Sequence, residues 1–300
     1  MTTPIEGVRS VGLATPDLDL LVTFYRDEWG LVPVASSPGL VHLGAAGSRE
    51  PFVLRLRQAD EARFDLVSLA VDSQVAVDQL FGTVVHAGTR VITEPADLDQ
   101  PGGGYGFRCF DTDGNVLELS SDMEAMAPLA APFAGAPESL SHLVWNSQDP
   151  EALSCFYCDV LGFRVADYLE DKLTFLRTNE VHHRVAIARS PFVGLNHAAF
   201  ECADIDAYLR ATGRLVRRGR TLLWGPGRHG PGDNTYAYFT DPAGFICEYT
   251  TGLEILDEDH EPRTWRSKPE ESDLWGLSNA RPNEAMLGWP DPGRWVAPPV

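Results

Sequence analysis

An internal duplication constrains the fold of this chain more than any other feature of the sequence. Residues 10–17, a strand-like segment that ends in an aspartate, recur as residues 142–149. In each copy the aspartate can cap a helix, and apolar residues at helical spacing follow it. Both helices are predicted to end at a glycine, Gly30 and Gly162, because glycine adopts the left-handed cap conformation most easily. The chain must therefore build one unit twice.

The repeat continues beyond the first helix of each copy. A second strand and helix, residues 67–72 and 75–80, match residues 196–201 and 205–209, and the last strands match as 113–119 and 243–249. Residues 122–138 between the copies are rich in alanine and proline, which disfavours helix and strand. We therefore predict an N-terminal non-catalytic domain at 1–121, a linker at 122–138, a catalytic domain at 139–253 and a tail at 254–300.

The tail combines prolines with four tryptophans, at positions 265, 275, 289 and 295. Disordered segments seldom contain so many tryptophans, since each gains free energy by packing its large apolar ring. The tail is predicted to lie across the domains or a neighbouring subunit. For Trp275 and Trp289, structural packing is favoured over substrate contact.

Composition limits the function classes. A net charge of −19 repels phosphate backbones, so nucleic acid is an unexpected partner and a small-molecule substrate is favoured. The sequence shows neither a bilayer-spanning apolar stretch nor a signal-peptide pattern, so a soluble cytoplasmic protein is expected. The five scattered cysteines suit a reducing compartment. Cys155 and Cys158 lack a second pair at zinc-finger spacing, which favours helix packing over a metal or redox role.

The second copy carries a set of residues that can bind a metal. His142, His197 and Glu248 lie in three separate strand-like segments. Two imidazoles and one carboxylate suit a non-haem Fe(II) site, because three coordination positions stay open. The alternative is that these are three unrelated polar residues in a sheet. Their equivalent places in one repeat make this alternative less favourable.

The first copy lacks this set. When the two copies are aligned by sequence, Ser10 stands in place of His142 and Ser68 in place of His197, although Glu118 matches Glu248. A hydroxyl is a poor ligand for a divalent transition metal. We therefore predict that Glu118 is structural.

These residues carry a family resemblance. The second half resembles the catalytic domain of type I extradiol ring-cleaving dioxygenases (catechol 2,3-dioxygenase-like), in the vicinal oxygen chelate superfamily, most specifically at His142, residues 182–188, His197 and residues 225–248. The resemblance implies an α+β fold with paired βαβββ modules in each of two domains, forming open barrels. It also implies Fe(II), or Mn(II), in the second domain only, and a homo-oligomer, with a tetramer favoured.

The resemblance also implies catalytic roles. Its His-His-x-x-Ala motif matches residues 182–186, which places His183 beside the oxygen-binding position and leaves His182 structural. His229 and Tyr238 match family residues that act on the substrate hydroxyls. Strand alternation alone cannot choose between Tyr236 and Tyr238, and the family match chooses Tyr238. From the residues alone, other interpretations remain open. Tyr238 could be an ordinary strand aromatic and His229 a solvent-exposed loop residue. The histidine pair could be an exposed strand end.

The implied activity is insertion of both atoms of O2 into a catechol beside its hydroxyls, giving a muconic semialdehyde type product in aromatic degradation. Relatives that act on carboxylated catechols tend to place an arginine where this chain has Trp224, so an apolar or aryl-substituted catechol is predicted. Trp224 could equally be loop packing, and Arg228 or Arg184 could receive a carboxylate.

Two other functions are weighed. A glyoxalase-like metal-dependent isomerase is disfavoured by His183 with Tyr238. A metal-free small-molecule-binding protein would have no evident use for the intact His142, His197 and Glu248 set.

Overall fold

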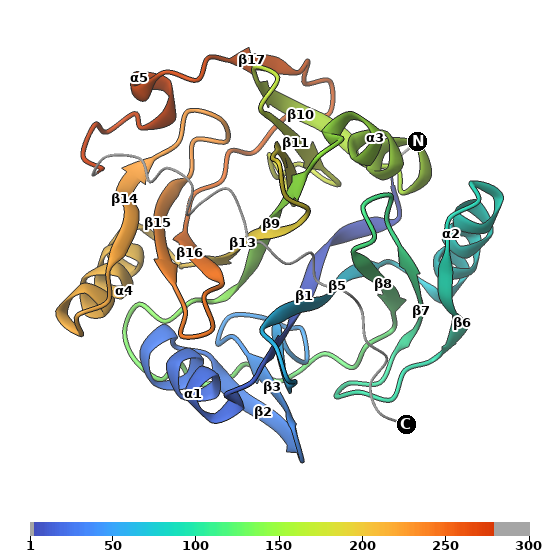
Figure 1. Cartoon of the computed structure of the whole chain (residues 1–300), viewed down its shortest axis with the longest axis horizontal. Coiled ribbons are helices and arrows are strands. Elements are labelled where there is room, and N and C mark those ends of the chain that lie inside the picture. The colour runs from blue at the N-terminus through green and yellow to red at the C-terminus, as the bar shows by residue number, and fades with distance from the viewer. Residues whose placement is uncertain (1–2, 279–300) are drawn as a thin grey trace.

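Each copy of the repeat folds into its own β-sheet, as the computed structural model, which describes residues 3–278, shows (Figure 1). The first sheet has the order β2 (Val32–Ser37), β3 (Leu40–Gly44), β4 (Leu54–Gln58), β1 (Ile5–Thr15), β5 (Arg63–Val71), β8 (Val116–Ser121), β7 (Tyr105–Phe110), β6 (Val91–Asp97). The second sheet has the order β14 (Leu222–Arg228), β15 (Thr235–Thr240), β16 (Ile246–Thr250), β13 (Gly194–Glu201), β9 (Ser139–Ser147), β12 (Val185–Arg189), β11 (Leu173–Arg177), β10 (Arg164–Leu169), β17 (Arg263–Trp265).

The two sheets have the same topology. Read from β10 to β14, the second sheet repeats the first strand for strand, and β17 is an addition at its edge. In each sheet the two central strands are antiparallel, and each pairs with a parallel strand on its other side. The predicted fold of paired βαβββ modules is confirmed.

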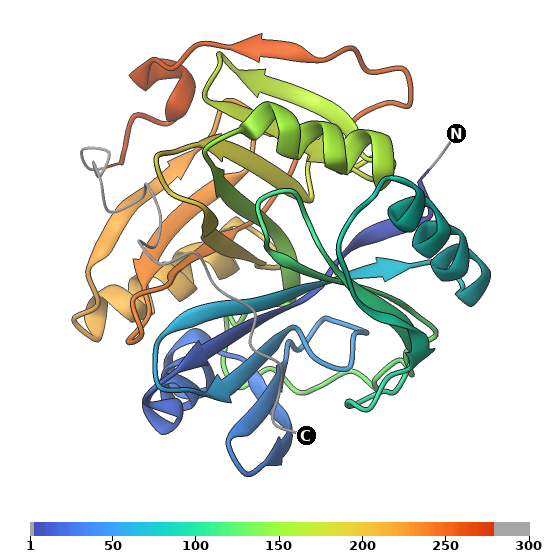
Figure 2. The same cartoon turned by 45° about the vertical axis from the view of Figure 1, so that its right-hand side comes forward.

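Helices connect the strands and lie on the outside of the molecule (Figures 1 and 2). They are α1 (Leu18–Thr23) with the π-helical turn η1 (Phe24–Trp29), α2 (Gln74–His86), α3 (Pro150–Cys155) with η2 (Phe156–Val160), α4 (Ile205–Arg217) and α5 (Pro269–Ser272). Asp17 and Asp149 cap α1 and α3 as predicted, since each carboxylate accepts a backbone N–H three residues on. Gly30 and Gly162 follow the π-helical turns with positive φ, also as predicted.

The strand register corrects one prediction about the repeats. Ser10 lies opposite Ser68 in the first sheet, and its counterpart His142 lies opposite Ala199 in the second. Ser68 therefore corresponds to Ala199. The counterpart of His197 is Leu66, which lies opposite Gly12 as His197 lies opposite Val144. The conclusion that the first copy cannot hold the metal stands, because leucine offers no ligand atom.

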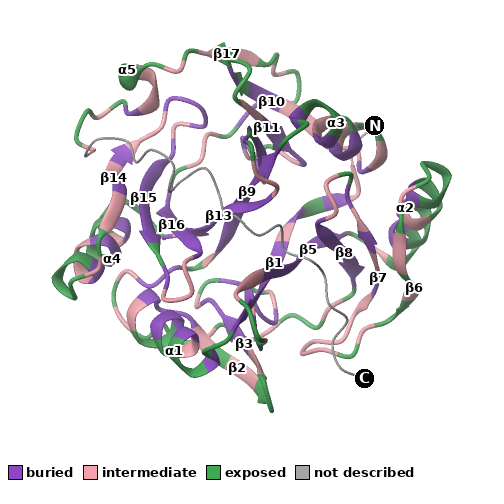
Figure 3. Ribbon diagram, in the orientation of Figure 1, coloured by how far each residue is buried: buried purple, intermediate pink, exposed green. Residues whose placement is uncertain are grey.

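The first half of the chain supports the strand that carries Glu248. Trp29, at the end of η1, stacks on Tyr249 with ring centroids 3.8 Å apart and planes 9° from parallel. The Tyr249 hydroxyl donates to the Trp29 carbonyl at 2.6 Å. Both rings are fully buried. Figure 3 shows that the strands around β16 are coloured mostly as buried. This packing against Tyr249 helps to fix the position of the neighbouring Glu248.

The segments between and after the sheets also have defined places. Residues 122–138 contain no helix or strand. In the tail, β17 pairs in parallel with β10, and Trp275 packs against the main hydrophobic core. The predictions for Trp289 and Trp295 lie outside the described residues. Within the described part of the chain, no helix is long and apolar enough to cross a membrane.

Candidate metal centre

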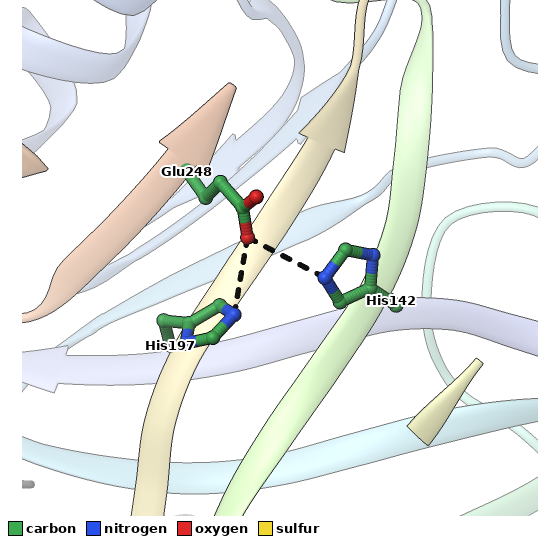
Figure 4. A group of neighbouring side chains, drawn as sticks. All are labelled: His142, His197 and Glu248. Atoms are coloured by element: carbon green, nitrogen blue, oxygen red, sulfur yellow. Dashed lines mark ion pairs between the residues drawn. The ribbon is translucent and has the colours of Figure 1, made fainter. Parts of the chain in front are cut away.

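Three adjacent strands bring His142, His197 and Glu248 together. They come from β9, β13 and β16, where Ala199 of the middle strand lies opposite both His142 and Glu248. The carboxylate points at both imidazoles (Figure 4), with Glu248 Oε2 at 3.4 Å from His142 Nε2 and 3.1 Å from His197 Nε2. One ligand atom from each residue lies within 4.8 Å of the others. The three side chains are buried.

The protonation states suit metal binding. Burial lowers the pKa of His142, and this outweighs the opposing contact with Glu248, so the imidazole is neutral. Burial opposes ionisation of Glu248, but the contacts with the two histidines are stronger and hold the pKa of its carboxyl at about 2. A neutral imidazole and an ionised carboxylate are the forms that bind a cation.

Unpaired atoms show that a metal fits this place. His197 Nε2 and both Glu248 carboxylate oxygens are buried and have no hydrogen-bond partner among residues 3–278. The other ring nitrogens are held: His142 Nδ1 lies 3.3 Å from Ser141 Oγ and His197 Nδ1 lies 2.7 Å from Asn196 Oδ1. Burying unpaired polar atoms is costly, and a cation between them removes that cost.

His183 lies beside this set and is oriented by two residues behind it. Its ring centroid is 4.4 Å from that of His142, and its Nδ1 lies 2.9 Å from His182 Nδ1. His182 Nε2 lies 3.1 Å from Asp167 Oδ2. An ionised carboxylate only accepts, so His182 Nε2 donates to Asp167, and His182 Nδ1, left with its lone pair, accepts from His183 Nδ1–H. The lone pair of neutral His183 is therefore on Nε2.

The tail holds the far end of this chain of hydrogen bonds. Trp265 Nε1 donates to Asp167 at 2.7 Å, and the Arg263 guanidinium and His260 Nε2 also contact its carboxylate. Burial opposes ionisation of Asp167, but these bonds and the one from His182 outweigh it and lower its pKa. His182, predicted as structural, thus connects the tail to His183.

His229 and Tyr238 lie on the other side of the set. The Tyr238 ring contacts His197 edge-on, with centroids 5.0 Å apart. His229 Nδ1 donates to the Ser272 carbonyl at 3.3 Å, so its Nε2 accepts from the Tyr238 hydroxyl at 3.0 Å. Burial lowers the pKa of His229 to about 4, which keeps the ring neutral. Trp224 stacks parallel to Tyr238 with centroids 5.6 Å apart.

These residues line one cavity of about 210 Å³. His142, His197, His183, His229 and Tyr238 surround its metal end. Its walls are largely apolar, from Val144, Leu169, Leu173, Phe175, Ala188 and Trp224. Asn146, Asn196, Lys172 and Arg189 also line it. The structure therefore brings the two predicted metal-binding histidines and the predicted catalytic residues, with Trp224, to one small-molecule-sized cavity, and Glu248 contacts the two histidines.

Arg228 and Arg184 are placed elsewhere. Arg228 forms a two-pronged ion pair with Asp233 at 2.7 and 2.6 Å, and neither arginine is among the described residues that line the cavity. Arg184 is half-buried near Glu201 and donates to the Ser141 carbonyl. This geometry gives no support to a substrate contact for either side chain.

The equivalent place in the first sheet holds an ion pair. Arg108 lies opposite Glu118 on the neighbouring strand, as Tyr238 lies opposite Glu248 in the second sheet. It donates to the Glu118 carboxylate at 2.7 Å, and Ser68 also donates to this carboxylate. Glu118 is paired with Arg108, which agrees with the prediction that it is structural. A guanidinium there replaces the cation that the second sheet can bind.

Sequence reasoning missed Asp167, Asn146 and Asn196. Asn196 could have been found, because it directly precedes His197 in the chain. Asp167 and Asn146 lie on other strands and give no local signal.

Comparison with known proteins agrees with this geometry. The model of the glyoxalase/bleomycin resistance protein/dioxygenase superfamily matches residues 139–249. A crystal structure of a Mn(II)-bound glyoxalase from Novosphingobium aromaticivorans is 40% identical, with a TM-score of 0.92, over 98% of this chain and 99% of that one.

Two curated relatives are dioxygenases. Metapyrocatechase 2 of Cupriavidus necator is 26% identical over 84% of this chain and 82% of its own length. The manganese-dependent 2,3-dihydroxybiphenyl 1,2-dioxygenase of Geobacillus genomosp. 3 is 27% identical over 95% of this chain and 98% of its own length.

Proposed function

Because the chain belongs to the glyoxalase/bleomycin resistance protein/dioxygenase superfamily, we propose that it is a metal-dependent extradiol dioxygenase that cleaves a catechol ring beside its hydroxyls with insertion of both atoms of O2. One observation carries this proposal. The unpaired His197 Nε2 and Glu248 oxygens face His142 within 4.8 Å, directly beside His183 and Tyr238.

The metal would be Fe(II) or Mn(II), held by His142, His197 and Glu248. Imidazole and carboxylate ligands suit both ions. Two similar proteins are described as manganese-bound or manganese-dependent, which supports Mn(II) as the alternative to iron. When bound, the metal would lower the pKa of a catechol hydroxyl and hold the catechol and O2 next to each other.

The side chains of the cavity would then handle the protons. The lone pair on His183 Nε2 is oriented to accept the proton of a substrate hydroxyl, after which the ring can return it to an oxygen atom that becomes basic. Tyr238 directs its own proton to His229, so its oxygen can accept a hydrogen bond from the second hydroxyl. The two sides of the cavity thus orient the two hydroxyls.

The walls support an apolar substituent on the catechol. Leu169, Leu173, Phe175 and Trp224 line the cavity. Lys172 and Arg189 are already paired with Glu170 and Glu151. A catechol with an alkyl or aryl group is therefore the proposed substrate class, with Trp224 as a wall that contacts it.

A glyoxalase-like isomerase is the second candidate. It is favoured by the 40% identity to the structure described as a glyoxalase. The cavity favours the dioxygenase, because a glutathione conjugate carries two carboxylates and the cations that line the cavity already have acidic partners.

The test loads the protein with Fe(II) or Mn(II) without oxygen. It then measures O2 uptake and visible product absorbance with catechol, alkylcatechols, 2,3-dihydroxybiphenyl and a carboxylated catechol. We expect a yellow product that is lost in His197→Ala, with the alkyl or aryl catechols preferred. Isomerisation of a glutathione hemithioacetal without turnover of any catechol would move the assignment to the second candidate.

Assembly and domain limits are part of the same proposal. The family resemblance supports a homo-oligomer, which light scattering coupled to size exclusion measures directly. Apart from β17 of the tail, the strands of each sheet come from one copy of the repeat, which supports domains at 1–121 and 139–253. Limited proteolysis should cut first within 122–138.

A further inference from the structure

A buried hydrogen-bond donor in the cavity has no partner. Asn146 is 1% exposed and lines the cavity, and its Nδ2 has no hydrogen-bond partner among the described residues. Leaving such a donor unpaired costs on the order of 1–3 kcal/mol. In a cavity built for a small molecule, an unpaired donor marks a place where the ligand supplies the acceptor.

The orientation of this donor follows from the metal centre. With a metal held beside Glu248, His197 Nε2 would supply its lone pair to that metal, so Nδ1 would carry the proton and donate to Asn196 Oδ1, 2.7 Å away. Asn196 Nδ2 must then be the donor to Asn146 Oδ1, at 2.9 Å. This order of hydrogen bonds fixes both amides, so the free end of Asn146 is the N–H group of Nδ2.

The place of Asn146 gives the distance of the acceptor from the metal. His142, Val144 and Asn146 alternate along β9, and all three line the cavity. Four residues of strand span about 13 Å, so Asn146 lies well beyond the ring that would bind at the metal. The substituent of the substrate, passing Val144, would reach it.

The acceptor is expected to be uncharged. Lys172 is paired with Glu170 at 3.1 Å and Arg189 with Glu151. One amide N–H does not compensate a carboxylate for the loss of its water in an apolar-walled cavity. A ketone, ether or hydroxyl oxygen needs only that one hydrogen bond.

We infer that Asn146 determines substrate specificity by donating a hydrogen bond to an uncharged oxygen on the substituent of the catechol. This inference rests on the proposed function. It narrows the substrate class from an apolar catechol to one whose apolar substituent ends in a neutral acceptor.

The test compares 3-butylcatechol with 3-(3-oxobutyl)catechol, which adds one carbonyl oxygen, and with 3-(2,3-dihydroxyphenyl)propanoate, which carries a carboxylate. Binding is measured by calorimetry without oxygen, in metal-free and metal-loaded protein, and kcat/KM by O2 uptake. We expect the ketone to be preferred to the butyl compound by about tenfold in both measurements. Asn146→Leu should abolish that preference.

Two variants support the reading of the result. Asn146→Asp keeps an oxygen for Asn196 Nδ2 but removes the amide donor, so it should also lose the preference for the ketone. Asn179→Leu makes the same change outside the cavity, where Asn179 donates to the Glu6 carbonyl, and should keep the ratio of the wild type.

Equal binding of the ketone and butyl compounds would overturn the inference, as would preference for the carboxylate over the ketone. An equal loss for both compounds in Asn146→Leu would also overturn it, since Asn146 would then act only through Asn196 and His197. If the wild type cleaves no catechol, the proposed function fails, and the binding ratio still decides the role of Asn146.

Discussion

Replacing His182 with phenylalanine tests how the cavity controls its proton acceptor. The change keeps a ring of similar size but removes both hydrogen bonds of His182, to Asp167 and to His183. His182 is fully buried, so water cannot replace either partner. Asp167 loses a donor to its charge, and His183 Nδ1–H is left unpaired. Each loss costs on the order of 1.5–3 kcal/mol, so the free energy of unfolding should fall by about 3–6 kcal/mol.

The functional effect should exceed what lost stability explains. Without His182, nothing in the described structure holds the proton of His183 on Nδ1, and part of the population should carry it on Nε2. General base catalysis contributes about 10²–10⁴ in rate, and we expect kcat to fall by about 10² with a smaller change in KM. Nitrogen-15 NMR of the metal-free protein reports the tautomer of His183, and urea unfolding reports stability.

His260→Phe is the matched control. It removes a contact to the other carboxylate oxygen of Asp167, Oδ1 at 3.1 Å, together with the contact to the Ala166 carbonyl. It should lower stability by about 1–2 kcal/mol and leave both kcat and the His183 tautomer as in the wild type. The reasoning is refuted if His182→Phe keeps the proton on Nδ1 and shows the same kcat as His260→Phe.

Three further predictions concern the metal, the core and pH. Glu248→Gln should weaken Fe(II) or Mn(II) binding by more than about 100-fold in calorimetry, while Glu118→Gln, its counterpart in the first sheet, should leave the stoichiometry unchanged. Trp29→Ala removes a fully buried ring stacked on Tyr249 and should lower the free energy of unfolding, measured in urea, by about 3–5 kcal/mol. A loss no larger than about 0.5 kcal/mol would show that Trp29 does not support the strand that carries Glu248. Burial opposes ionisation of Asp167, but the hydrogen bonds that its carboxylate accepts outweigh burial and lower its pKa. The ionised carboxylate therefore stabilises the fold above the ordinary pKa of aspartate, about 4. This stabilisation is lost as the pH falls towards the pKa of Asp167 in the folded state. Between about pH 5 and pH 3, wild type should therefore lose more stability than Asp167→Asn, and equal losses would show that Asp167 is not stabilised by its partners.

Much of the fold and the metal set could be predicted from local patterns. Asp17, Asp149, Gly30 and Gly162 mark helix ends by chemistry that acts within a few residues, so their roles are readable in the sequence. The duplication then places His142, His197 and Glu248 at comparable points of one repeat, which is enough to predict that they meet.

Register could not be predicted in the same way. Side chains alternate with a period of two, so a shift of two residues leaves the same face buried, and Ser68 fits the pattern as well as Leu66 does. The pairing of Gly12 with Leu66, and of Val144 with His197, decides the match. These pairings depend on how two strands meet, which neither strand encodes alone.

The sequence by itself determined the repeated unit, its helix ends and the residue types of the metal set, because each depends on neighbours along the chain. Only the tertiary structure decided which atoms of that set are free and which are held. Asp167 orients His183 through His182, and Asn146 receives its orientation from His197 through Asn196. Such hydrogen bonds join side chains on strands far apart in the sequence, and each fixes the donor and acceptor sense of the next only once the strands are packed.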